Sequence, residues 1–203
     1  MTTKKRVAIL ISGRGTNMAA LMRAAWAEDY PAKIVLVFSN VETAQGLKTA
    51  QAAGIRTQAL SHKEFATRED FDAALDEALT HLDVDLICEA GFMRIHSDPF
   101  VQKWEGKILN IHPSLLPSFK GLRVHEQTLE AGVRISGCTV HFVTPALDGG
   151  PIIAQAAVPV LPNDTPDTLA ARILIEEHRI YPEALRMVCE GKVRLENGRA
   201  VFA

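Results

Sequence analysis

Asn110-Ile111-His112 contains two side chains with the types and spacing that acyl transfer requires. The segment closes a short apolar run that predicts a buried strand, and residues two apart in a strand point to the same face. An amide N–H beside an imidazole can stabilise an oxyanion and supply a proton. Pro113 and Pro117 bracket the following loop and stiffen it. A hydrogen-bonded strand-end pair would need no catalytic role, but this arrangement favours catalysis.

A carboxylate that can serve this pair stands in the turn Asp148-Gly149-Gly150-Pro151. The glycines let the turn reach over a site, where Asp148 would orient a histidine and stabilise its charge. Asp-Gly is also a common turn pair, so a purely structural role stays open. His141, upstream on the predicted strand, is either a partner behind the catalytic groups or a hydrogen-bonded core histidine, and we favour the first.

The segment Ser12–Asn17 (SGRGTN) lies between a predicted strand and a predicted helix. Glycines allow close backbone approach to an anion, and the free N–H groups of a helix N-terminus point at it, so the segment predicts a phosphate site. A dinucleotide site would need a third glycine at Met18 and an acidic residue where Ser39-Asn40 stands. A tight strand–helix turn without a ligand is the alternative.

Other chemistries find little support. Ser114 and Ser118 have no dedicated base in their local sequence, and no GxSxG motif is present. The cysteines lie in apolar runs or beside a glycine, without CxxC spacing, and are expected to be structural and free in a reducing compartment (Cys88, Cys138, Cys189). The remaining histidines lack metal-ligand spacing, so we expect no metal (His62, His81, His96, His125, His178).

The elements that must position these residues alternate between apolar strands and helices. This order predicts an α/β fold with a doubly wound, mostly parallel sheet, helices on both faces and an antiparallel edge in the C-terminal half. The expected strands are 6–12, 33–39, 57–60, 86–88, 108–111, 136–143 and 152–160, with a terminal hairpin of 193–195 and 200–202. The expected helices are 18–27, 44–53, 68–81, 99–104, 124–131 and about 166–189.

Length and composition predict one globular domain over residues 1–203. A net charge of −2 gives no electrostatic support for nucleic acid or an anionic membrane as partner. The apolar run Val7–Ile11 is too short for a signal peptide or a membrane span. We therefore expect a cytoplasmic protein that holds anionic small molecules by local groups, either as a monomer or as a homodimer.

Taken together, these segments resemble the phosphoribosylglycinamide formyltransferases of purine biosynthesis. The resemblance runs nearly end to end, through Ile180-Tyr181-Pro182. Its most specific segments are Ile11–Asn17, Gly91–Ile95, Asn110–Gly121, Val140–Pro151 and Glu177-His178. It implies a formyltransferase-type fold, and it implies 10-formyltetrahydrofolate and phosphoribosylglycinamide as substrates.

The resemblance also implies roles for individual residues. Asn110, His112 and Asp148 correspond to the catalytic trio. The N-terminal half would bind the ribosyl-glycinamide, and the C-terminal half would supply the folate and catalytic loop. The implied ribosyl-glycinamide contacts are Gly15, Thr16, Asn17 and Glu177. The implied folate contacts are Arg68, Met93, Arg94, Ile95, His96, Asn110, Thr144 and Leu147.

The chain departs from the family pattern at a few positions. Arg14 stands where many relatives have Asn, His96 replaces an expected apolar residue, and Pro145-Ala146 replaces an acidic pair. Two other functions stay open: the core of a formyltetrahydrofolate hydrolase and a non-catalytic nucleotide-binding module. The hydrolase is expected to carry an extra N-terminal domain, whereas here the first strand begins by Arg6. A transfer RNA formyltransferase is expected to have a basic C-terminal extension.

Overall fold

The computed structural model describes residues 3–203 and contains a seven-stranded sheet in the order β3-β2-β1-β4-β5-β6-β7. Its strands are β1 (Lys5–Ile11), β2 (Ala32–Ser39), β3 (Thr57–Ala59), β4 (Leu86–Glu89), β5 (Ile108–His112), β6 (Ile135–Phe142) and β7 (Ile152–Pro159). The first five strands pair in parallel, whereas β6 pairs antiparallel with both of its neighbours, β5 and β7. The predicted fold class, including the antiparallel edge, is confirmed.

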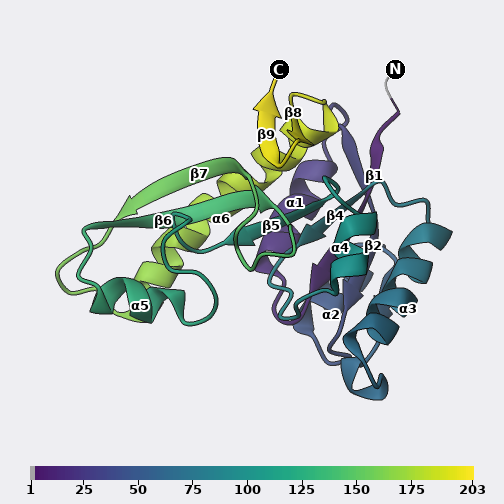
Figure 1. The fold of residues 1–203 in the computed structure, drawn as a ribbon, viewed down its shortest axis with the longest axis horizontal. Coiled ribbons are helices and arrows are strands. Elements are labelled where there is room, and N and C mark those ends of the chain that lie inside the picture. The colour runs from purple at the N-terminus through teal and green to yellow at the C-terminus, as the bar shows by residue number, and fades with distance from the viewer. Residues whose placement is uncertain (1–2) are drawn as a thin grey trace.

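Helices cover both faces of this sheet (Figure 1). They are α1 (Thr16–Ala25), α2 (Gln45–Ala52), α3 (Arg68–His81), α4 (Asp98–Lys103), α5 (Val124–Glu130) and α6 (Pro166–Cys189), with a short 3₁₀ turn at His62–Glu64. Side chains of α1, α2 and α6 share one apolar core, and those of α3 and α4 share a second core across the sheet. The sheet is therefore the middle layer of three.

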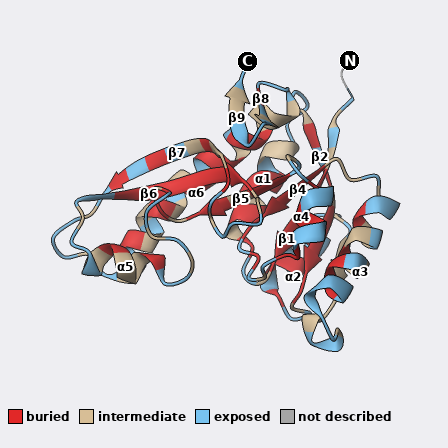
Figure 2. Ribbon diagram, viewed as in Figure 1, coloured by how far each residue is buried: buried red, intermediate tan, exposed pale blue. Residues whose placement is uncertain are grey.

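The alternation of β1 explains why this strand is apolar along its length. Val7, Ile9 and Ile11 belong to the α1/α2/α6 core, whereas Ala8 and Leu10 belong to the α3/α4 core. A strand covered on both faces has no solvent side that would favour polar residues. Figure 2 shows the same burial along the central strands, with exposed residues on the outer helix faces.

Local signals set most element boundaries within one or two residues of the predicted ones. The Thr165 side chain accepts a hydrogen bond from the Thr168 backbone N–H, closing a capping box at the start of α6. Helix α1 begins two residues before the predicted Met18, because Gly15 adopts the left-handed conformation directly ahead of Thr16. Asn197 and Gly198 both have positive φ and turn the hairpin of β8 (Val193–Glu196) and β9 (Arg199–Phe202).

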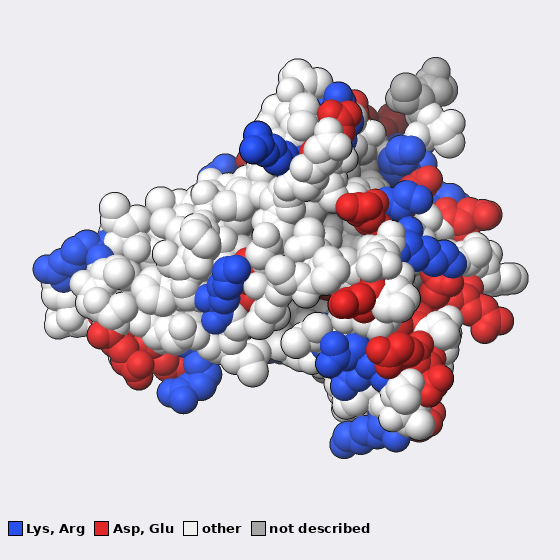
Figure 3. Space-filling model, in the orientation of Figure 1, with Lys and Arg blue, Asp and Glu red and all other residues white. Residues whose placement is uncertain are grey.

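Charges of both signs are interspersed around α3 on the face shown in Figure 3, whereas the area over β6 and β7 carries few. This distribution agrees with a net charge of −2, which gives no large field of one sign. Across residues 3–203, no helix combines the length and apolar character that a bilayer crossing needs.

Candidate active site

The predicted phosphate loop joins β1 to α1. Gly15 has a φ of 73°, and no side chain caps the helix, so the first backbone N–H groups of α1 are free of a cap. A Cβ at Gly15 would lie 3.0 Å from Met18 Cε and 3.1 Å from Gly46 Cα. Glycine therefore serves both the turn conformation and the close approach of two backbone segments.

Asn17 and Glu177 meet beside this loop, although they are 160 residues apart. Asn17 Nδ2 donates a 2.7 Å hydrogen bond to Glu177 Oε2, and both side chains are buried. Burial raises the pKa of Glu177, and the hydrogen bond from Asn17 opposes that rise. Asn17 Oδ1 is buried without a hydrogen-bond partner among the described residues. The structure thus brings together two of the four residues expected to contact the ribosyl-glycinamide.

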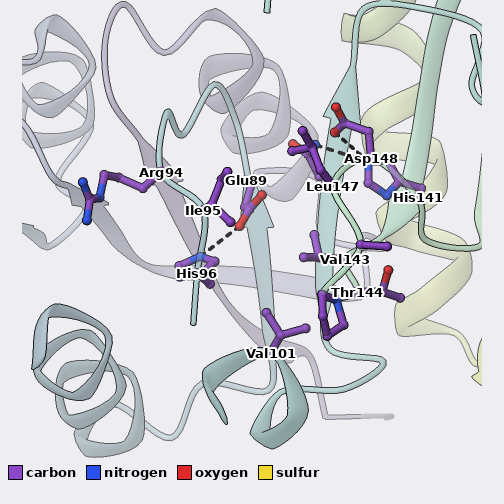
Figure 4. Close-up of a pocket in the computed structure, with 13 residues that line it drawn as sticks. Glu89, Arg94, Ile95, His96, Val101, His141, Val143, Thr144, Leu147 and Asp148 are labelled. Atoms are coloured by element: carbon purple, nitrogen blue, oxygen red, sulfur yellow. Dashed lines mark hydrogen bonds and ion pairs between the residues drawn. The ribbon is translucent and has the colours of Figure 1, made fainter. Parts of the chain in front are cut away.

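The predicted catalytic trio converges where β5 extends beyond β4. Figure 4 shows two side chains at this point, His141 and Asp148. His112 Nδ1 lies 3.6 Å from Asp148 Oδ2, and His141 Nε2 lies 4.0 Å from Asp148 Oδ1. Asn110 Nδ2 lies 3.3 Å from His141 Nε2. The Gly121 N–H donates to Asp148 Oδ2 at 2.8 Å and fixes the carboxylate between the two imidazoles. His141 therefore lies behind the trio and joins Asn110 to Asp148.

Hydrogen bonds define which ring nitrogens are available. His141 Nδ1 is 2.9 Å from the Phe142 carbonyl, which only accepts, so Nδ1 carries the proton. Burial lowers the pKa of His141, more than Phe142 and Asp148 raise it, so the ring is neutral and Nε2 accepts from Asn110. His112 Nε2 donates to the Phe119 carbonyl at 2.8 Å. Nδ1 is consequently the nitrogen of His112 that faces Asp148 and the reacting groups.

A pocket adjoins the trio on the side of α4. Six of the eight residues expected to contact folate line it: Arg94, Ile95, His96, Asn110, Thr144 and Leu147. The other two do not. Arg68 is exposed at the start of α3, and the Met93 side chain is 65% exposed. The Met93 backbone N–H donates to Ser12 Oγ at 2.8 Å, which places the loop after β4 against the phosphate loop.

Sequence reasoning missed one charged residue of this pocket. Glu89 ends β4, is only 7% exposed, and lines the pocket beside Asn110 and His141. A carboxylate that closes an otherwise apolar buried strand is the signal that could have revealed it.

The three cysteines are free, as expected. Burial raises the pKa of the Cys138 and Cys189 thiols to about 12 and that of Cys88 still further, so the thiolate form is disfavoured at each. Within residues 3–203, no three acidic, histidine or cysteine side chains are grouped as metal ligands would be.

Comparison with known proteins places this geometry in a family. Residues 5–185 match the family model described as "Formyl transferase". The chain is 43% identical to the phosphoribosylglycinamide formyltransferase of Haemophilus influenzae, over 97% of this chain and 92% of that protein. It therefore belongs to the formyl transferase family.

Two further relatives show how the similarity extends. The crystal structure of glycinamide ribonucleotide transformylase 1 from Symbiobacterium toebii superposes with a TM-score of 0.95 at 47% identity, covering 98% of this chain and 94% of that one. The trifunctional purine biosynthetic protein adenosine-3 of Gallus gallus is 54% identical over 96% of this chain. The chain spans only about a fifth of the length of that trifunctional relative (19%).

Proposed function

We propose that this chain transfers the formyl group of 10-formyltetrahydrofolate to the amine of 5'-phosphoribosylglycinamide, giving the formylglycinamide ribonucleotide and tetrahydrofolate. The observation that carries this proposal is the position of Asp148 between His112 and His141, with the Asn110 amide beside them. Family membership and the relatives named above support the choice of both substrates.

In the proposed reaction, the substrate amine attacks the formyl carbon bonded to N10 of the folate. The C–N bond that forms produces a tetrahedral oxyanion, which the Asn110 amide N–H and the protonated His112 stabilise by hydrogen bonds. Asp148 orients His112 and passes the proton from the attacking amine toward N10. The C–N10 bond then breaks and tetrahydrofolate leaves, so no covalent intermediate with the chain is needed.

The contact between His112 and Asp148 fits this sequence of steps. At 3.6 Å, the His112 Nδ1 to Asp148 Oδ2 distance is longer than a hydrogen bond. Contacts between catalytic groups are often long without substrate and tighten in the reacting complex. Because the Gly121 N–H already holds Asp148 Oδ2, substrate binding needs to move only a short stretch of loop.

Both halves of the chain contribute to each proposed binding region, because Glu177 of α6 meets Asn17 and the pocket includes Arg94 and His96. Gly15, Thr16, Asn17 and Glu177 would hold the phosphate and ribose of the acceptor, and the pocket beside the trio would hold the pterin. Contact between the loops after β1 and β4 puts these two regions next to each other. The acceptor amine and the formyl donor would therefore approach each other at Asn110 and His112.

The test is an assay of the purified chain with 10-formyltetrahydrofolate, with and without the ribosyl-glycinamide. Formylated product is expected only when the acceptor amine is present. Tetrahydrofolate release with no acceptor would identify a hydrolase, and binding without turnover would identify a binding module. Asp148→Asn keeps an oxygen for the Gly121 N–H but removes the charge, so turnover should fall about 100-fold or more with little loss of stability. Turnover near that of the wild type would contradict the mechanism.

A further inference from the structure

Glu89 lies in a row of polar side chains that crosses the sheet. In the strand register, Glu89 pairs with Asn110, and Asn110 pairs with His141. Directly paired residues of neighbouring strands point to the same face. The carboxylate therefore lies on the same face of the sheet as the proposed catalytic groups, and all three residues line the pocket.

One side of the Glu89 carboxylate is held by a buried histidine. His96 Nε2 lies 2.9 Å from Glu89 Oε1, and His96 Nδ1 lies 2.8 Å from Asp72 Oδ1 (Figure 4 shows the Glu89 contact). The N–H of Nε2 is not aligned as in a hydrogen bond to Oε1, so this contact is an ion pair. The His96 ring stacks between Phe92 and Phe100, with centroids 5.3 and 4.4 Å away. Carboxylates at both nitrogens and aromatic rings on both faces favour the imidazolium form.

The charges of this cluster do not cancel. Two carboxylates flank one imidazolium, and Asp72 also accepts a hydrogen bond from the Ser97 N–H. The unbalanced negative charge therefore lies at Glu89, on the pocket side. Among residues 3–203, no N–H or O–H group donates to Glu89 Oε2, although the side chain is only 9% exposed. A carboxylate oxygen that opens on the pocket without a donor from the protein can accept a hydrogen bond from a ligand that displaces water there.

The remaining walls of the pocket suit a flat ring. Ile95, Val101, Val143 and Leu147 contribute apolar side chains around Glu89. A reduced pterin contains a flat pyrimidine ring whose edge carries N–H donors. The faces of the pterin would contact these aliphatic side chains, while an N–H group on its edge would reach Glu89 Oε2.

We propose that Glu89 is a specificity residue for the folate co-substrate: its free carboxylate oxygen accepts a hydrogen bond from an N–H group of the reduced pterin, and His96 positions it. This inference rests on the proposed function, because it takes the pocket to be the folate site. It gives His96, which stands where the family pattern has an apolar residue, a role in this chain. His96 is the counter-ion of the carboxylate that accepts a hydrogen bond from the ligand.

The experiment measures the dissociation constant of tetrahydrofolate, the unreactive product, for the wild type and for Glu89→Gln. A hydrogen bond to a charged group predicts a dissociation constant about 10- to 100-fold larger in the variant. The Michaelis constant for the ribosyl-glycinamide should stay unchanged. Asp72→Asn is the matched control, since it removes a carboxylate from the opposite side of the same imidazole, and tetrahydrofolate affinity should change less than threefold.

Unchanged tetrahydrofolate affinity in Glu89→Gln would overturn the proposal. So would a fall in turnover at unchanged affinity, because Glu89 would then act on its neighbour Asn110 rather than on the ligand. If Glu89→Gln does not fold, the double variant Glu89→Leu/His96→Leu replaces both buried charges with apolar side chains, which proteins often tolerate. That variant should also bind tetrahydrofolate at least 10-fold more weakly, and wild-type affinity would refute the inference. Wild-type formyl transfer tests the proposed function separately.

Discussion

The buried ion cluster at His96 predicts that the folded chain loses stability in alkaline solution. Burial alone would lower the pKa of His96, but the contacts with Asp72 and Glu89 raise it to about 9. These two carboxylates, from α3 and β4, are the charged groups that meet the ring. In the unfolded chain the pKa returns to about 6.5. The folded chain therefore holds this proton over a pH range in which the unfolded chain has released it.

The sign and size of the effect follow from that difference. Below about pH 6.5 both states are protonated and the stabilisation is complete, and it is lost as the pH rises through about 9. A pKa of about 6.5 in the unfolded chain and about 9 in the folded chain means that His96 contributes about 3 kcal/mol to the free energy of unfolding. This is a large part of the total stability of an ordinary domain.

The assay is urea unfolding of the wild type and of Glu89→Leu/His96→Leu between pH 6 and 10, followed by tryptophan fluorescence. Cysteines, tyrosines and the other histidines titrate in both proteins, so their contributions cancel in the difference between the two curves. The wild type should lose about 3 kcal/mol relative to the variant across this range. Parallel pH dependences would show that His96 does not carry a raised pKa, and the ion-pair argument would fail.

Three further predictions concern other parts of the site. Glu177→Gln keeps an acceptor for Asn17 but removes the charge, so the Michaelis constant for the ribosyl-glycinamide should rise about tenfold while tetrahydrofolate affinity is unchanged. An unchanged Michaelis constant would remove Glu177 from the acceptor site. Gly150→Ala would put a Cβ 1.7 Å from the Phe142 carbonyl oxygen, so the loop with Asp148 must shift. Turnover should therefore fall at least about tenfold and the melting temperature should drop. If both stayed at their wild-type values, the assignment would be refuted. Replacing all three cysteines by alanine should preserve most of the turnover per folded molecule, and near-complete loss would instead point to thiol chemistry (Cys88, Cys138, Cys189).

The sequence predicted those features of the fold that depend on neighbouring residues. The capping box at Thr165 and the turn at Asn197-Gly198 are set within four residues, and both are confirmed. The apolar run of β1 required cover on both faces, and the two cores supply it. Boundaries differed where a backbone conformation decided them, as at Gly15.

The candidate site was predictable to the extent that one strand and one turn carry it. The two-residue spacing of Asn110 and His112 placed both on one strand, and the prediction that Asp148 reaches them agrees with the geometry. Their catalytic roles stay predictions. The cluster around His96 was not predictable, because it depends on how α3 packs beside the loop before α4 and brings Asp72 to a ring 24 residues away. Spacing in the sequence contains no signal for such packing.

The placement of the chain ends has a consequence for attaching this protein to something else. β1 begins at Lys5, and the β8–β9 hairpin packs near Gly106, just ahead of β5, so both ends lie beyond the amino ends of the parallel strands (Figure 1). Asn110 and His112 lie toward the carboxyl end of β5. A tether, a fluorescent tag or a fused enzyme joined at either end would therefore project away from the proposed catalytic edge and leave the proposed substrates free to enter.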